Sequence, residues 1–153
     1  MEYDTRKAER VWQRVQGEER ESTAPRHSEN LPALIMEQLQ LAETYRQLAY
    51  RCSGREGTMY MGLAREAKAQ AVCLKGILKL VTGKNPEIAI PPQQIGLADT
   101  VLRRCYGQEL RLMTEYENRR GDGEYGPVFE RMAIRSRDHC CTLLEMIGKT
   151  GQP

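Results

Sequence analysis

Four stretches of the chain carry apolar residues at alternating steps of three and four, the spacing of one face of a helix. They cover about residues 31–51, 54–83, 97–120 and 126–148. Asn30 and Pro32 are typical of a helix start, and Ser53 with Glu56 has the spacing of a capping box. Gly83 is a typical helix stop. The pattern predicts an all-α protein with four long helices.

The connections between these helices differ in length. Those near residues 52–57 and 121–126 are short, which predicts two antiparallel hairpins. Residues 84–96 carry three prolines and cannot be helical; extended at ~3.3 Å per residue, they reach roughly 40 Å. A helix of about 24 residues is roughly 36 Å long, so this connection can cross the bundle and leave the second and third helices parallel. Two hairpins joined by one long crossover are the ferritin-like form of a four-helix bundle.

The segment before the first long helix has a different pattern. Residues 4–17 predict a short amphipathic helix, and residues 18–30 are polar and aperiodic, as in a linker. Apolar residues at helical spacing mark this helix: Ala8, Val11, Trp12 and Val15. We expect Trp12 to anchor it on the main body, with anchoring to a partner as the alternative. The predicted organisation is residues 1–30 as helix and linker, and residues 31–150 as the bundle.

The second hairpin resembles a diverged copy of the first. A shift of 71 residues aligns these pairs: Leu31 with Leu102, Gln38 with Glu109, Leu39 with Leu110, Leu41 with Leu112, and Tyr45 with Tyr116. A shift of 69 residues aligns these: Tyr60 with Phe129, Leu63 with Met132, Ala64 with Ala133, Gln70 with His139, and Leu74 with Leu143. The repeat predicts a pseudo-twofold axis through the core.

Composition and charge narrow the range of functions and cellular locations that we expect for this protein. Lys and Arg total 23 against 21 for Asp and Glu, a net charge of +2, which argues against nucleic-acid binding. The sequence has no apolar run long enough to span a membrane and no apolar leader, so we expect a cytoplasmic protein. We expect its five cysteines to be reduced and mostly small buried side chains, with redox or metal binding as the alternative: Cys52, Cys73, Cys105, Cys140 and Cys141.

We call the apolar face of each predicted helix its seam, and it is read at alternating steps of three and four residues. The seams consist of Leu31, Leu34, Gln38, Leu41, Tyr45 and Leu48; Tyr60, Leu63, Ala67, Gln70, Leu74, Ile77 and Val81; Leu102, Cys105, Glu109, Leu112 and Tyr116; and Phe129, Met132, Ser136, His139, Leu143 and Met146. Each predicted helix carries polar residues near the middle of its seam. They are Gln38, Gln70, Glu109, Ser136 and His139, and the repeat places them at matching depths. A buried polar group is costly unless it is hydrogen-bonded, so we expect these side chains to satisfy one another or a ligand.

Residues 31–148 resemble rubrerythrin-like members of the ferritin-like superfamily. The resemblance lies in the spacing of Glu109 and Tyr116, the end of the second helix at residues 80–83, and the Asp-His-Cys stretch at 138–140. It implies two irons, held by a Glu from each of the first and third helices and a Glu-x-x-His from each of the other two.

Most of the implied ligand positions hold other residues. Glu109 and His139 match the family pattern, whereas the remaining positions are Gln38, Ala67, Gln70 and Ser136. Glutamine is a poor iron ligand, alanine offers no donor, and the negative charge that two irons need is missing. We therefore expect no normal di-iron centre and no other cofactor. We expect a core in which Glu109 pairs with His139 and the glutamine amides complete the network.

This interpretation favours a structural or interaction protein over an enzyme, with an unknown protein partner or a second copy of the chain as candidates. The alternative is a residual site for iron or another divalent metal at Glu109 and His139, with peroxide or oxygen chemistry of the rubrerythrin type. Gln38 and a stray carboxylate or thiol would complete that site. We expect the nearby carboxylates Glu37, Glu43 and Glu66 to face solvent, although Glu66 would turn inward if its helix were locally distorted.

Overall fold

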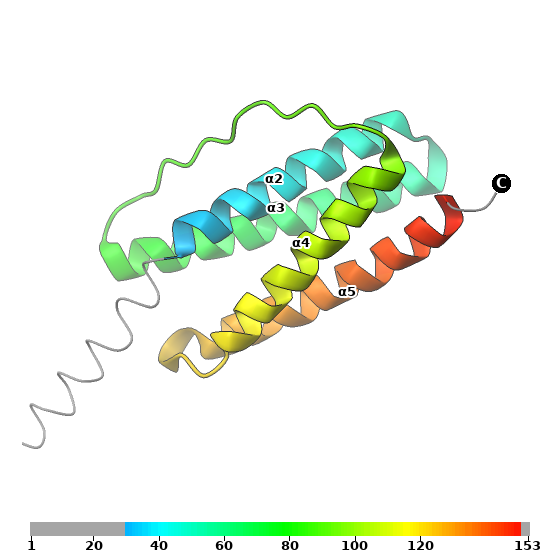
Figure 1. The fold of residues 1–153 in the computed structure, drawn as a ribbon. Helices are drawn as coiled ribbons and strands as arrows, with labels where there is room; N and C mark the ends of the chain where they lie inside the picture. Colours follow the sequence, from blue (N-terminus) through cyan, green and yellow to red (C-terminus); the bar gives the residue numbers. More distant parts are fainter. Residues whose placement is uncertain (1–29, 151–153) are drawn as a thin grey trace, which may run out of the picture.

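The computed structural model describes residues 30–150, which form four long helices and one short 3-10 helix (Figure 1). The elements are α2 (Leu31–Arg51), α3 (Gly54–Thr82), α4 (Ala98–Asn118), η1 (Gly123–Tyr125) and α5 (Gly126–Thr150). The prediction of an all-α protein with four long helices is confirmed. The predicted helix around Trp12 and the linker after it, apart from Asn30, lie outside the described residues.

The helix ends agree with the sequence signals in part. Gly83 caps α3 in the left-handed region at φ 74°, and its N–H donates to the Lys79 carbonyl at 2.7 Å. Ser53 is the N-cap residue of α3, but its side chain makes no capping hydrogen bond, so the predicted capping box does not form. Helix α5 continues past Gly148 to Thr150, because a glycine weakens a helix without ending it.

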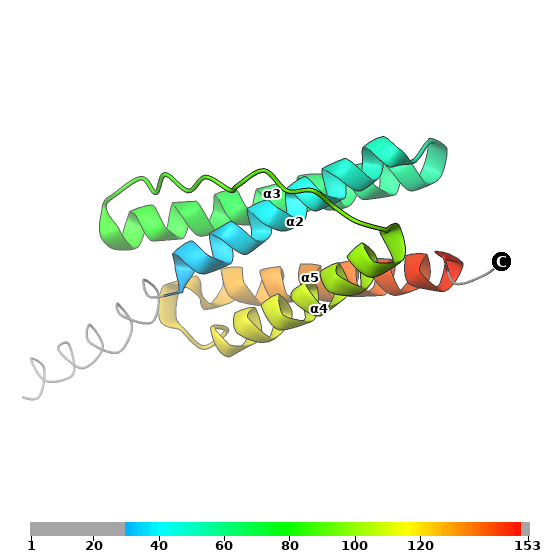
Figure 2. The ribbon, with the colours of Figure 1, turned by 45° about the horizontal axis from the view of Figure 1, so that its top comes forward.

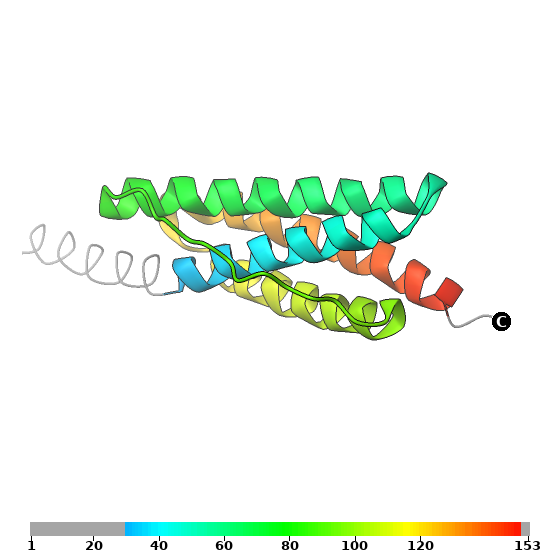
Figure 3. The same ribbon diagram turned by 90° about the horizontal axis from the view of Figure 1, so that it is seen from above.

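The helices pack as two hairpins, α2 with α3 and α4 with α5. Figure 2 shows one hairpin lying over the other. The connection from α3 to α4 runs the length of α2 on the outside of the bundle (Figures 1 and 3). Helices α3 and α4 consequently run in the same direction, as the loop lengths predict.

Helix α2 holds this crossover through its polar face. Gln47 Nε2 donates to the Gln93 carbonyl at 2.7 Å, and the Arg51 guanidinium donates to the carbonyls of Ile95 and Gly96 at 2.7 and 2.6 Å. Ile95 is buried against the core. The hydrogen bonds satisfy carbonyls of a segment that has no regular structure of its own.

The core follows the predicted apolar faces. All of their residues are buried except Val81, which is half-buried near the end of α3. The largest side chains with almost no exposure include Tyr45, Tyr116 and Phe129. None of the helices within residues 30–150 is long and apolar enough to cross a membrane.

Candidate functional site

Polar side chains fill the middle of the core, as the sequence predicts. Five of them are at most 2% exposed: Gln38, Gln70, Glu109, Ser136 and His139. They come from all four helices, and all of them except Ser136 belong to two hydrogen-bonded clusters, each of which also contains a buried tyrosine. We call these the acidic cluster (Tyr45, Glu66, Glu109 and His139) and the amide cluster (Gln38, Gln70 and Tyr116).

The acidic cluster takes one residue from each helix. Glu109 Oε1 accepts a hydrogen bond from the Tyr45 hydroxyl at 2.9 Å and lies 3.1 Å from Nδ1 of His139. The other ring nitrogen of His139, Nε2, lies 2.5 Å from Oε2 of Glu66. The imidazole is thus held between two carboxylates, one from α4 and one from α3. The predicted pairing of Glu109 with His139 is present in the structure.

This geometry favours a positive charge on His139. An ionised carboxylate only accepts hydrogen bonds, so both ring nitrogens must carry a proton if both contacts are hydrogen bonds to ionised partners. Burial by itself lowers the pKa of His139, but the hydrogen bond and charge of Glu109, with a smaller contribution from Glu66, outweigh it. The pKa of His139 is raised above its ordinary value of 6.5. The imidazolium is the form that the cluster stabilises.

Tyr45 contributes a proton to the same carboxylate. Burial and the nearby charge of Glu109 raise the pKa of Tyr45 well above 10, so its hydroxyl stays protonated and donates. The second carboxylate oxygen of Glu109, Oε2, is buried without a hydrogen-bond partner among residues 30–150. Tyr45 was predicted only as a core residue, because a tyrosine on an apolar face gives no sign of where its hydroxyl points.

Glu66 was expected to face solvent, and the structure corrects this expectation in part. Its side chain is 50% exposed, but its carboxylate turns back to the buried imidazole. Glu66 precedes the seam residue Ala67, and its longer side chain reaches across to α5. The other two carboxylates bind arginines instead: Glu37 pairs with Arg111 and Glu43 with Arg46.

The amide cluster contains no charged group. Gln38 Nε2 donates to Gln70 Oε1 at 2.9 Å and to the Tyr116 hydroxyl at 2.7 Å. The opposite ends of both amides, Gln38 Oε1 and Gln70 Nε2, are buried without a partner among residues 30–150, and so is the hydroxyl of Ser136. The amides were predicted to complete the network around Glu109 and His139; instead they bond to each other, and Gln38 bonds to Tyr116.

The residues present do not fit a di-iron centre. Ala67 is fully buried and offers no donor, and two of the positions that the resemblance assigns to Glu and His carry neutral amides. A metal-bound histidine gives one ring nitrogen to the metal and donates from the other. In His139 both nitrogens face carboxylates, and the imidazolium form that these contacts favour has no lone pair to give. Within residues 30–150, no group of three or more His, Cys, Asp or Glu side chains has the geometry of a metal site.

The described residues contain only free thiols, and two of these lie in the core. Burial raises the pKa of Cys105 to about 12 and that of Cys140 to about 11. A thiol with such a pKa is protonated near neutral pH and is a weak nucleophile and metal ligand. Cys73 and Cys141 are exposed on α3 and α5, and Cys52 is half-buried, so the expectation of mostly buried thiols is correct only for Cys105 and Cys140.

Neither a protein-family model, nor a curated protein, nor a solved structure matches this chain.

Proposed function

We propose that this chain is a ferritin-like bundle of rubrerythrin-like descent in which a hydrogen-bonded polar core has replaced the di-iron centre. Its role is then structural or an interaction role rather than oxygen or peroxide chemistry. The fold-level part of the proposal rests on the two hairpins, the long crossover and the internal repeat. The family assignment is an inference from analogy in fold and motif.

The contacts of the His139 ring nitrogens are the observation that supports the proposed loss of the di-iron centre. His139 matches the family's ligand pattern, but both of its ring nitrogens are directed at carboxylates. Two further ligand positions, where the resemblance implies glutamates, hold the buried neutral residues Gln38 and Ala67, and Gln70 occupies a histidine position. A polar core of this kind sets the register of packed helices, because a shift of one helix would leave its buried groups unpaired.

Restoring the missing ligands tests the proposal most directly. The quadruple variant Gln38→Glu, Ala67→Glu, Gln70→His and Ser136→Glu recreates the implied ligand set around Glu109 and His139. We expect about two irons per chain in this variant after anaerobic Fe(II) loading and desalting, and close to none in the wild type. A folded quadruple variant that binds no iron would contradict the proposed descent.

Metal content of the wild-type protein tests the loss of the centre separately. The full chain is incubated with Fe(II), Mn(II) or Zn(II), desalted and analysed for metal. One metal per chain that disappears in Glu66→Gln would overturn the proposal in favour of a single-metal site of Glu66, Glu109 and His139. Peroxide turnover by such a loaded protein would then support the oxidoreductase alternative.

A further inference from the structure

The two clusters correspond to each other position by position under the internal repeat. Shifts of 71 and 69 residues relate these pairs: Tyr45 and Tyr116, Gln38 and Glu109, Gln70 and His139, Glu66 and Arg135. The hydrogen bonds follow the same exchange. Tyr45 on α2 bonds to residue 109 on α4, and Tyr116 on α4 bonds to residue 38 on α2. Gln38 makes both of its hydrogen bonds through Nε2, and Glu109 makes both of its contacts through Oε1. The other terminal atoms, Gln38 Oε1 and Glu109 Oε2, have no partner within residues 30–150.

The two clusters differ at one position, where the amide cluster has a hydrogen-bond donor without an acceptor. In the acidic cluster, His139 Nε2 meets the carboxylate of Glu66. In the amide cluster, the equivalent atom is Gln70 Nε2, which is buried and has no acceptor among residues 30–150. The position equivalent to Glu66 is Arg135, another donor. Two donors therefore lie where the other half of the molecule has a donor and a carboxylate.

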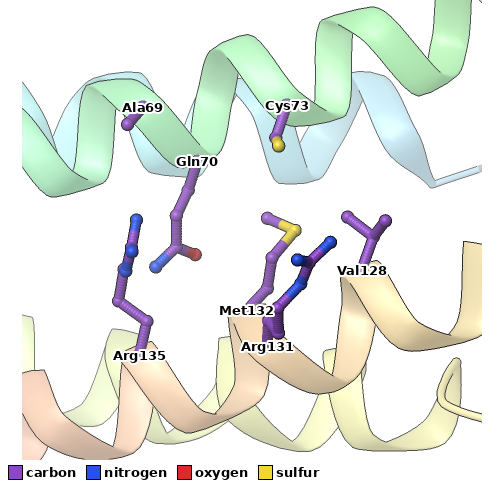
Figure 4. A pocket seen from close by; sticks show the side chains of 7 residues that line it. All are labelled: Ala69, Gln70, Cys73, Val128, Arg131, Met132 and Arg135. Atoms are coloured by element: carbon purple, nitrogen blue, oxygen red, sulfur yellow. The ribbon is translucent and has the colours of Figure 1, made fainter.

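A pocket of about 300 Å³ lies at this place, between α3 and α5. Figure 4 shows the Gln70 amide and the Arg135 side chain entering it from opposite helices, with Arg131 one turn away. Most of its remaining lining is apolar, from Ala69, Val128 and Met132. No acidic side chain of residues 30–150 lies within ion-pair distance of Arg131 or Arg135.

We propose that this pocket binds a small organic carboxylate with a compact apolar group. The carboxylate accepts from the Arg135 guanidinium and the Gln70 amide, in the place that Glu66 takes beside His139. Arg131 adds positive charge, and the apolar group lies against Val128 and Met132. Arginine forks suit carboxylates, and the apolar wall favours an organic anion over inorganic phosphate. The volume is at the lower end of the range for small-molecule sites. Only Gln70 is shared with the proposed loss of iron, which does not depend on this binding.

Binding of benzoate to the full chain tests the proposal by calorimetry, with benzamide as the neutral analogue. We expect saturable binding of one benzoate per chain and none of benzamide. Arg135→Gln should weaken benzoate binding by about tenfold or more, the effect of losing one charge-assisted hydrogen bond, and Arg131→Gln should weaken it less, through the loss of charge alone. Arg137→Gln is the matched control, because Arg137 is an exposed arginine on the same helix outside this pocket. Equal weakening in that variant, or binding of phosphate in place of benzoate, would overturn the proposal.

Cys73 provides a second readout inside the pocket, and Cys141 an internal control outside it. Both thiols are exposed, and only Cys73 lines the pocket. We expect anionic iodoacetate, relative to iodoacetamide, to favour Cys73 over Cys141, and benzoate to protect Cys73 alone. Mass spectrometry of peptides from the modified protein measures both ratios. Equal protection of the two thiols, or of neither, would contradict the site.

Arg135→Glu separates the proposal from a simpler arrangement in which Arg135 donates to a rotated Gln70 amide. In our proposal, this variant supplies the missing carboxylate from the chain itself. We expect it to abolish benzoate binding and to raise the midpoint of thermal unfolding. If Arg135 instead caps the Gln70 oxygen, Arg135→Glu lowers the midpoint and the wild type binds no benzoate, which overturns the proposal.

Discussion

The acidic and amide clusters show how one hydrogen-bond geometry accommodates two different chemistries. In each cluster a tyrosine hydroxyl bonds to a central side chain in the other hairpin. That central side chain also contacts a third group on the second helix of its own hairpin. The central atom is a carboxylate oxygen in one cluster and an amide nitrogen in the other, so the tyrosine donates in the first and accepts in the second. The shared geometry comes from the internal repeat, and the difference comes from substitution at equivalent positions.

The difference also determines how strongly each cluster depends on its members. In the acidic cluster, Glu109 is fully buried and its carboxylate favours the imidazolium form of His139. Loss of His139 leaves the buried Glu109 carboxylate without its cationic partner, whereas loss of a member of the amide cluster leaves only neutral groups unpaired. The two clusters should therefore respond unequally to equivalent truncations.

The largest expected effect is that of His139→Ala. We expect it to lower the free energy of unfolding by roughly 2–4 kcal/mol, because Glu109 keeps only its Tyr45 hydrogen bond. Gln70→Ala at the equivalent position removes a side chain of similar size and should cost about 1–2 kcal/mol. Urea unfolding of both variants, with circular dichroism as the signal, measures the difference.

Chelator is the control for this pair. The cost of His139→Ala should be the same with and without EDTA, because the cluster needs no metal in our interpretation. A cost that falls in EDTA would show that the wild type gains stability from bound metal. Equal costs for the two truncations would mean that the charge on Glu109 is not what distinguishes the clusters.

The sequence predicted the arrangement of the helices well because loop length and apolar spacing are local properties. Two short connections and one with three prolines leave few ways to join four helices, and the structure has the predicted hairpins. The helix ends were less predictable. The Ser53 side chain makes no capping bond although it has capping-box spacing with Glu56, since spacing does not specify which rotamer the cap adopts.

The sequence predicted the buried residues of the candidate site but not all of the side chains to which they bond. Spacing alone identifies Gln38, Gln70, Glu109 and His139 as core positions. Spacing does not identify Glu66, because a long side chain next to the apolar face can turn either to water or to a buried donor. The prediction that the glutamines bond to Glu109 and His139 was also wrong, since amides can pair with each other as well as with a carboxylate.

The pH dependence of stability should distinguish the two clusters by a smaller amount. His139 has a pKa raised above 6.5, facing Glu109 on α4, Glu66 on α3 and the neutral hydroxyl of Tyr45 on α2. A raised pKa in the folded state stabilises the protein fully below 6.5, and this stabilisation is lost as the pH rises through the folded-state pKa. We expect the free energy of unfolding of the wild type to fall as the pH rises above 6.5.

His139→Gln is the matched variant for this measurement, because it gives the acidic cluster the side chain found at position 70. Its free energy of unfolding should fall less over the same range. The measurement ends below pH 9, so the buried thiols of Cys105 and Cys140 do not affect it, since a thiol with a raised pKa destabilises only above its ordinary value of 9. Parallel pH profiles for the two proteins would mean that the His139 imidazole is neutral in the folded state.

The smallest effect is expected at the entrance to the two clusters, where Glu66 and Arg135 occupy equivalent positions. Glu66→Gln should cost about 0–1 kcal/mol, and less at high salt, because the carboxylate is half exposed and screened. In the absence of added carboxylate, Arg135→Gln should cost less still, since its guanidinium has no acidic partner within residues 30–150. Differential scanning calorimetry at low and high salt resolves the two. If Arg135→Gln proves the costlier change, Arg135 already bonds to the Gln70 amide, and the amide cluster is closed by the chain itself, as Glu66 closes the acidic one.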